Sequence, residues 1–313
     1  RRVLFRSKFW RVKPLNNYLP LLALGFTVLV WGVAPAFIRS FSLAAGAADA
    51  LVIRSVATGI CCLLLLPFFG GFTVARQDVP RLLLISLIGM FGYFAGSVFG
   101  FAYVSSAVGG IVISTQPLLI ALLASVIGAE RVTVPTIIGL IVSFAGSLYL
   151  FSGDAQGNLS HASMITGGLL IFMSGAFWAG YVIYSKSLIQ TYGSVKLSLL
   201  SLAIATLPAL FFISPGTWAT TVGLTQNSIL SLVYLTFIGT LVTLGTWNYA
   251  VGLLRPTAVG ASLYLIPIFA ITAGTLLLGE IVTVTTLIAG AIILLGVAIA
   301  QFGPTLWKYR PQT

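Results

Sequence analysis

The sequence predicts an all-α integral membrane protein with ten transmembrane helices, built as two inverted-topology five-helix repeats with both termini in the cytoplasm. Three observations predict this fold class: an extreme apolar composition, a repeat at a distance of 150 residues, and a one-sided distribution of basic residues. The 313 residues are 58% hydrophobic and 7% charged, with a mean hydropathy of +1.09. Soluble domains carry about 25% charged residues, so this composition points to a polytopic membrane protein.

Ten apolar segments each have roughly the 20 residues that a helix needs to cross ~30 Å of hydrocarbon. They lie at about 18–38, 47–69, 82–104, 107–129, 132–151, 164–186, 195–213, 228–253, 257–278 and 282–302. We therefore divide the chain into a basic cytoplasmic segment at 1–17, a first five-helix repeat at 18–151, a second at 164–302, and a cytoplasmic tail at 303–313.

The repeat is clearest between residues 117–146 and 267–296, which align without a gap. The matching positions include Pro117 with Pro267, Glu130 with Glu280, and the Val-Thr-Val runs at 132–134 and 282–284. Such self-similarity indicates an internal duplication. Because each half has an odd number of spans, the halves enter the membrane with opposite orientation. This arrangement is typical of secondary transporters, which bind substrate near mid-membrane where the repeats meet, although channels can also be built in this way.

The basic residues predict the orientation. Fourteen of the sixteen Lys and Arg residues fall on one side of the ten-span topology, six of them before the first span, and only Arg39 and Arg54 do not. Lysine and arginine collect in cytoplasmic loops, so both termini are expected in the cytoplasm. The same placement attributes the net charge of +11 to membrane topology and not to nucleic-acid binding.

The chain resembles the EamA-type branch of the drug/metabolite transporter superfamily over residues 18–302. The resemblance is carried by Trp31-Gly32, Arg54, Ala107 to Pro117 and Glu130 in the first half, and by Trp178, Ala258 to Pro267 and Glu280 to Gly296 in the second. It implies a multi-pass metabolite exporter of the bacterial cytoplasmic (inner) membrane, most similar to aromatic and neutral amino-acid exporters. The alternatives are a multidrug or other-metabolite exporter of the same family, and a passive channel-like facilitator.

Polar and aromatic side chains at mid-depth predict a cavity for the substrate, because polar groups in a membrane tend to face protein or water. The candidate lining residues are Trp31, Tyr93, Ser97, Gln116, Trp178, Tyr181, Trp247 and Tyr264. Aromatic faces would hold an apolar side chain or attract an ammonium group, while amide and hydroxyl groups would orient polar ends. A packing or interfacial role stays open for the Trp residues, and an interhelical hydrogen bond for Gln116 and Tyr93.

Two prolines and a run of glycines predict how the helices bend and pack. Pro117 and Pro267 each remove a backbone donor at mid-depth, and we expect a helix break with a gating role at both. Gly92, Gly96 and Gly100 recur every four residues in the third span. This spacing favours close packing of two helix backbones.

Charged residues near the ends of the spans predict two latches. Each half carries a Trp followed eight residues later by a cation, Arg39 in the first half and Lys186 in the second. Glu280 shares a predicted membrane side with Arg39, and Glu130 shares the other side with Lys186. Arg54 is the one basic residue well inside a span. We expect it to reach the outer interface or pair with Asp49 or a helix end, while contact with a substrate carboxylate stays open.

The sequence predicts a transporter and no enzyme. We find no catalytic group, no cluster with metal-ligand spacing and no nucleotide loop, so we expect no cofactor. The absence of Asp and Glu near the centre of any span weakens a proton-coupled mechanism. The expected partners are a small-molecule substrate and the lipid bilayer, without nucleic acid. The oligomeric state stays open.

Overall fold

The structure is a computed structural model that describes residues 18–127, 133–152, 160–254 and 262–308. Every regular element within these ranges is helical, and none of them contains a β-strand. The predicted all-α class is therefore confirmed for this part of the chain. The predicted basic segment at 1–17, the end of the predicted tail, and Glu130 lie outside the described residues.

In its described residues, the first half contains seven α-helices with short irregular helical turns between them. Their bounds are α1 Leu19–Ala45, α2 Ala47–Leu65, η1 Leu66–Phe69, η2 Arg76–Asp78, α3 Val79–Leu84, η3 Ile85–Met90, α4 Phe91–Tyr103, α5 Ser106–Ile113, α6 Gln116–Val126 and α7 Val134–Ser152. The segments α3, η3 and α4 follow one another directly and form a single long helix in which η3 is a π-helical turn.

The second half repeats much of this order. Its elements are α8 His161–Tyr192, α9 Ser194–Ala209, η4 Leu210–Phe212, α10 Thr217–Val222, α11 Gln226–Val233, η5 Tyr234–Val242, α12 Thr243–Leu253, η6 Leu263–Leu265, α14 Ile266–Leu278 and α15 Val284–Lys308. Here α11, η5 and α12 form the long helix, and η5 is again π-helical.

Within the described residues, seven helices are long and apolar enough to cross a membrane, and three shorter apolar helices accompany them. The seven run over 19–45, 47–69, 76–103, 106–126, 161–192, 194–212 and 226–247, and the shorter ones over 134–150, 266–278 and 284–300. The shorter helices fall on the fifth, ninth and tenth predicted spans. A helix suits these apolar segments because it satisfies its own backbone hydrogen bonds in lipid.

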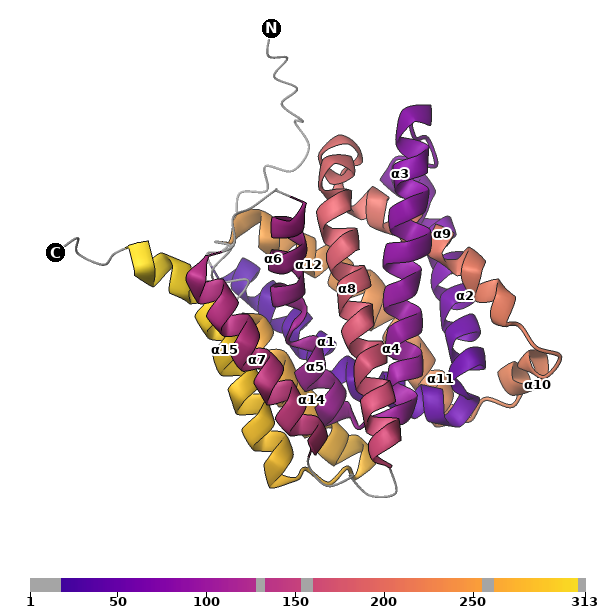
Figure 1. Cartoon of the computed structure of the whole chain (residues 1–313). Coiled ribbons are helices and arrows are strands. Elements are labelled where there is room, and N and C mark those ends of the chain that lie inside the picture. The colour runs from indigo at the N-terminus through magenta and orange to yellow at the C-terminus, as the bar shows by residue number, and fades with distance from the viewer. Residues whose placement is uncertain (1–17, 128–132, 153–159, 255–261, 309–313) are drawn as a thin grey trace, which may run out of the picture.

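The helices pack in pairs that join distant parts of the chain (Figure 1). α7 lies against α15 at one edge of the bundle, α2 lies against α9 near the opposite edge, and α4 and α8 run side by side between them. α1 contacts α12 and α14. Each of these pairs joins one predicted half to the other.

The α4–α8 pair is close because α4 presents glycines to α8. A Cβ added to Gly96 would lie 2.8 Å from both the Leu170 carbonyl oxygen and the Ser174 Cβ, so a larger residue could not keep this contact. Gly92 and Gly100 similarly face Phe177 and Ile171. The packing role that the glycine spacing predicts is confirmed.

Two helix breaks interrupt the bundle near the predicted prolines. α5 ends at Ile113, α6 begins at Gln116, and Pro117 occupies the first turn of α6. The Ser114 and Thr115 hydroxyls donate to the carbonyls of Ile111 and Val112, at 2.6 and 2.7 Å, which satisfies acceptors at the break. Pro267 likewise lies in the first turn of α14, directly after η6. The structure thus has a helix start at both prolines.

Candidate functional site

Four aromatic rings form a chain between α4 and α8. The Tyr93 ring lies 5.6 Å from Phe94 and 5.1 Å from Trp178, and Trp178 stacks on Tyr181 at 5.4 Å with an interplanar angle of 24°. We call Tyr93, Phe94, Trp178 and Tyr181 the aromatic cluster. Trp178 and Tyr181 share a helix face because residues three apart on a helix are neighbours. Tyr181 also approaches α9, with its hydroxyl 3.5 Å from Ser198 Oγ.

Arg54 of α2 lies at one end of the aromatic cluster. Its side chain is buried, with 7% of its surface exposed, and the guanidinium carbon stands 4.5 Å from the centre of the Phe94 ring. Arg54 Nε and Nη1 are buried and have no hydrogen-bond partner. A small cavity of about 10 Å³ adjoins the guanidinium. It is lined by Arg54, Ser55, Thr58, Phe94, Leu202, Ala205 and Thr206.

The expected pairing of Arg54 with Asp49 is wrong, and neither Nε nor Nη1 of Arg54 bonds to a helix end. Asp49 instead accepts hydrogen bonds from Thr217 and Thr220, both at 2.6 Å. These threonines lie on α10, so Asp49 anchors that short helix to the start of α2. Arg54 is five residues beyond Asp49, and such a spacing does not place two side chains on the same helix face.

A second aromatic pair joins α1 to α12. The Trp31 and Trp247 rings are 4.8 Å apart, and Trp31 Nε1 donates to Thr243 Oγ1 at 3.1 Å. One turn before Trp31, the Thr27 and Thr246 hydroxyls meet at 2.7 Å. The structure therefore groups Trp31 with Trp247, in a cluster that Tyr93, Trp178 and Tyr181 do not join.

The other predicted lining residues have different surroundings. Gln116 begins α6, and its Nε2 is buried without a hydrogen-bond partner beside α8, where a Cβ added to Gly175 would lie 3.2 Å from Gln116 Cγ. Ser97 is 2% exposed, and its hydroxyl donates to Ser174 Oγ at 3.3 Å across the α4–α8 contact. Its observed surroundings are thus those of a packing residue. Tyr264 falls in η6, and its side chain lies outside what the structure describes.

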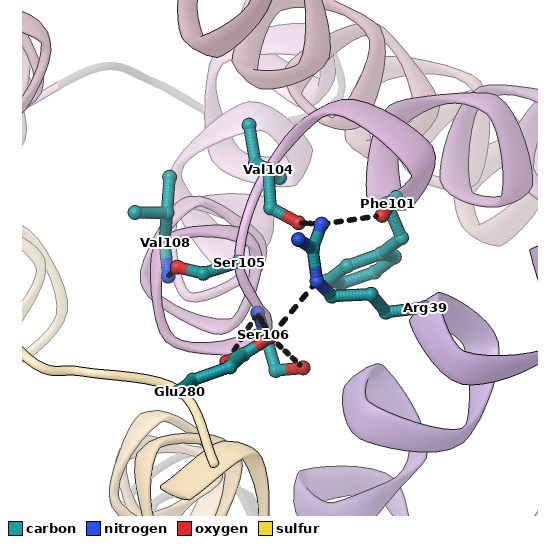
Figure 2. Close-up of polar contacts among 7 residues, drawn as sticks. All are labelled: Arg39, Phe101, Val104, Ser105, Ser106, Val108 and Glu280. Atoms are coloured by element: carbon teal, nitrogen blue, oxygen red, sulfur yellow. Dashed lines mark hydrogen bonds and ion pairs between the residues drawn. The ribbon is translucent and has the colours of Figure 1, made fainter. Parts of the chain in front are cut away.

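At one end of the bundle, Arg39 and Glu280 form a clamp around the turn between α4 and α5 (Figure 2). Arg39 Nε lies 2.9 Å from Glu280 Oε1. Arg39 Nη1 donates to the Phe101 carbonyl at 3.1 Å and to the Val104 carbonyl. Glu280 accepts from Ser106, with backbone N–O distances of 3.0 and 2.9 Å and a hydroxyl distance of 3.1 Å. We refer to Arg39, Glu280 and Ser106 as the end clamp.

The clamp satisfies two helix ends with charges of the appropriate sign. Arg39 binds carbonyls at the C-terminal end of α4, and Glu280 binds the first amide of α5. A cation at a helix C-terminus and an anion at an N-terminus are both favourable. The α14 helix ends at Leu278, and its C-cap Gly279 has a left-handed φ of +64°. Glu280 N then donates to the Gly274 carbonyl at 3.1 Å. This turn directs the Glu280 side chain toward Ser106.

The second predicted latch is not described. Glu130 lies outside the described residues, and Lys186 is an exposed residue of α8. Sequence reasoning missed Ser106, Phe94 and Thr243. Only Ser106 carried a local signal, since consecutive serines before an apolar run are a common helix start. Within the described ranges, no group of three or more His, Cys, Asp or Glu could hold a metal ion.

Comparison with known proteins gives matches along nearly the whole chain. The model of the EamA-like transporter family matches twice, at residues 19–152 and 165–301. An uncharacterized transporter of Archaeoglobus fulgidus is 25% identical over 279 residues, which are 89% of this chain and 97% of that protein. A protein of known crystal structure aligns with a TM-score of 0.59 and 22% identity, covering 94% of this chain and 98% of the other, and so shares its fold.

Two further relatives have more specific names. A probable amino-acid metabolite efflux pump of Salmonella typhimurium is 27% identical over 254 residues, covering 77% of this chain and 83% of the relative. A probable terminal-alkyne amino-acid exporter of Streptantibioticus cattleyicolor is 26% identical over 285 residues, covering 88% and 91% of the two chains.

Proposed function

The chain belongs to the EamA-like transporter family, and from that premise we propose that it is a secondary transporter that exports small metabolites across the bacterial cytoplasmic membrane. The cargo we propose is amino acids with apolar or aromatic side chains. It is a transport protein without enzymatic activity, and its partners are the small-molecule substrate and the lipid bilayer. The names of the amino-acid efflux relatives, which are about a quarter identical in sequence, support an amino-acid cargo.

The proposed architecture is ten membrane spans in two inverted five-helix repeats, with both termini in the cytoplasm. Two family-model matches of similar length support the duplication. The π-helical turns at 85–90 and 234–242 interrupt the third helix of each half at corresponding places. The hydroxyls of Thr133 and Thr136 meet at 2.9 Å at the start of α7, and those of Thr283 and Thr286 meet at 2.9 Å at the start of α15.

The aromatic cluster is the observation that carries the proposed cargo. Tyr93, Trp178 and Tyr181 stand together between α4 and α8, and Trp178 and Tyr181 pack in an apolar core that includes α9. Aromatic pairs hold an apolar or aromatic ligand better than area alone accounts for, by about 0.5–1.5 kcal/mol. Gln116, with its unpartnered buried amide on the neighbouring α6, would supply a polar contact to such a ligand.

The mechanism we propose is alternating access around this cluster. The end clamp lies at the membrane side that the basic residues predict to be outside, and it would close that side while substrate enters from the cytoplasm. Opening would separate the Arg39–Glu280 pair. The helix starts at Pro117 and Pro267 would provide the joints, because a proline leaves a carbonyl of the preceding turn without its usual donor.

A transport assay separates the candidate functions. The protein in liposomes should take up labelled phenylalanine, tryptophan or leucine with saturable kinetics, and unlabelled amino acid on the opposite side should accelerate the uptake. Flux that rises linearly with concentration and ignores the opposite side would reject the carrier and favour a passive facilitator. Transport of lipophilic cations with no amino-acid flux would favour a multidrug exporter.

A further inference from the structure

The buried charge of Arg54 has no counter-ion among the described residues. The chain has five acidic residues, of which the structure describes three. Asp49 is bonded to α10, Asp78 accepts from Tyr192 at 2.6 Å, and Glu280 belongs to the end clamp. Burying an unpaired charge is costly. Arg54 is only 7% exposed and two of its N–H donors have no partner. A ligand that binds these donors would explain why the charge is buried.

A second unpartnered group faces the same cavity. Thr58 follows Arg54 by one helical turn, is 4% exposed, and its hydroxyl has no hydrogen-bond partner. Thr206, on the opposite wall, is already engaged because its hydroxyl donates to the Ser55 carbonyl at 3.0 Å. Arg54 and Thr58 therefore offer a cation and a hydroxyl donor from one face of α2, which is a donor set suited to an anion.

The residues around Arg54 and Thr58 restrict which kind of anion can bind there. Phe94 covers the guanidinium, and from Phe94 the rings continue through Tyr93 to Trp178. A ligand that reached both Arg54 and these rings would have one anionic end and an apolar body. A phosphorylated cargo would need further cations to bind its phosphate. The partly buried Arg39 is already paired with Glu280. A cationic cargo would be repelled by the unpaired guanidinium.

We propose that Arg54 and Thr58 bind the carboxylate of the transported molecule while its side chain lies on the aromatic cluster, which makes the cargo a carboxylate-bearing neutral amino acid. This inference rests on the proposed export function and specifies its substrate class. It also separates amino acids from the cationic drugs carried by a multidrug exporter.

The site is closed in the present conformation. A cavity of about 10 Å³ holds roughly one water molecule, and a carboxylate needs more room. The Phe94 ring and the α9 residues that line the cavity must move apart from Arg54 to admit it. In this conformation the cavity is too small for substrate and the Arg39–Glu280 pair is formed. We therefore expect substrate binding to be linked to opening of the bundle.

Matched acid and amide ligands test the inference. The purified full-length protein would be titrated with L-phenylalanine, L-phenylalaninamide, 3-phenylpropionate and 3-phenylpropionamide, and affinity read from thermal shifts. The wild type should bind each acid about tenfold or more tightly than its amide. Arg54→Gln should weaken binding of the acids by roughly 10- to 100-fold, the range expected for a hydrogen bond to a charged group. Binding of the amides should be nearly unchanged.

Further variants keep the test decisive if Arg54→Gln fails to fold. Thr58→Val replaces the hydroxyl with a methyl group of similar size and leaves Arg54 in place. It should weaken binding of the acids only. Arg54→Lys keeps the charge without the planar donors and should fall between the wild type and Arg54→Gln. Arg81→Gln removes an exposed arginine, bonded to Ser187 at 2.7 Å, and should preserve the preference for acids.

Three results would overturn the inference. The first is equal binding of acid and amide by the wild type. The second is an equal loss of affinity for acid and amide in Arg54→Gln, which is the result expected if Arg54 has only a structural role. The third is stabilisation by chloride with no preference for organic acids, which would make this an inorganic anion site. If no amino acid is transported in liposomes but 3-phenylpropionate still binds through Arg54, the export proposal fails and the carboxylate assignment stands.

Discussion

Arg39 on α1 and Glu280 after α14 form an ion pair at 2.9 Å, and between them they cap the two helix ends that meet at the α4–α5 turn. The pair thus ties α1 and the end of α14 to the α4–α5 turn, three places that are far apart in the sequence. Arg39 and Glu280 are only 13% and 10% exposed, so water does little to weaken their attraction. Surface ion pairs contribute about 0–1 kcal/mol, whereas a partly buried pair with satisfied partners is costly to break from one side.

The first prediction concerns the coupling of these two side chains. Arg39→Gln and Glu280→Gln should each lower stability, because each leaves the other charge unpaired. The double variant should lose less than the sum of the single losses, by a coupling energy of about 1–3 kcal/mol. The measurement is a double-mutant cycle on unfolding in detergent micelles, run alongside initial transport rates. Additive effects on both stability and transport would reject the clamp as a unit.

The second prediction tests the space that the clamp needs. A Cβ added to Gly274 would collide with Glu280 Oε2 and approach Ser106 Cβ to 3.1 Å. Gly274→Ala should therefore push the Glu280 carboxylate away from Ser106 and destabilise the protein by about 1–3 kcal/mol, the usual cost of overpacking. Thermal unfolding measures the loss, and Arg39→Gln made in the Gly274→Ala background should cost less than in the wild type.

A matched glycine supplies the control. Gly25 lies on α1, and a Cβ added there would meet nothing within 4 Å. Gly25→Ala should leave stability unchanged or raise it slightly, because alanine is the better helix former. An equal loss in Gly25→Ala and Gly274→Ala would show that the clash with Glu280 is not the cause.

The sequence was sufficient for the fold class and for much of the helix order. Continuous apolar segments specify helices in lipid regardless of tertiary contacts. The spacing of Gly92, Gly96 and Gly100 predicted a close helix contact, and the structure shows that the partner is α8. The meeting of Arg39 and Glu280 could be hypothesised because the positive-inside rule and the repeat put both residues on one membrane side.

Other contacts depend on tertiary structure that the sequence does not reveal. Asp49 is near Arg54 in sequence, yet the threonines of α10 capture its carboxylate after the chain folds back. Ser97 was expected at a cavity because it is polar and at mid-depth, but the close α4–α8 contact gives its hydroxyl a partner in Ser174. Ser106 carried a helix-start signal in the sequence, but its role as a partner of Glu280 depends on the tertiary contact between the α4–α5 turn and Glu280.

The third prediction addresses the aromatic cluster. Trp178 stands between Tyr93 and Tyr181, so Trp178→Ala removes the central ring. We expect the KM for phenylalanine and tryptophan to rise by about 3- to 10-fold, as the loss of one aromatic pair would give, with a smaller change for alanine. Uptake kinetics in liposomes measure the effect.

Trp218 provides a tryptophan for comparison. It lies on α10 and is 76% exposed, so Trp218→Ala should leave the KM values for all three amino acids unchanged. If Trp178→Ala raised the KM for alanine as much as that for phenylalanine, the ring would contribute to packing and not to selectivity.

The last prediction separates function from stability at Gln116. Its Nε2 is buried without a hydrogen-bond partner, and such a group carries a desolvation cost of about 1–3 kcal/mol. Gln116→Leu keeps a similar volume and removes the unsatisfied amide, so stability should hold or increase by about 1 kcal/mol. Transport should nevertheless fall severalfold if the amide binds substrate. The combined measurement is thermal unfolding with uptake of labelled phenylalanine. A stable variant with normal uptake would remove Gln116 from the site, and an unstable one would reveal a hydrogen bond within the protein that this conformation lacks.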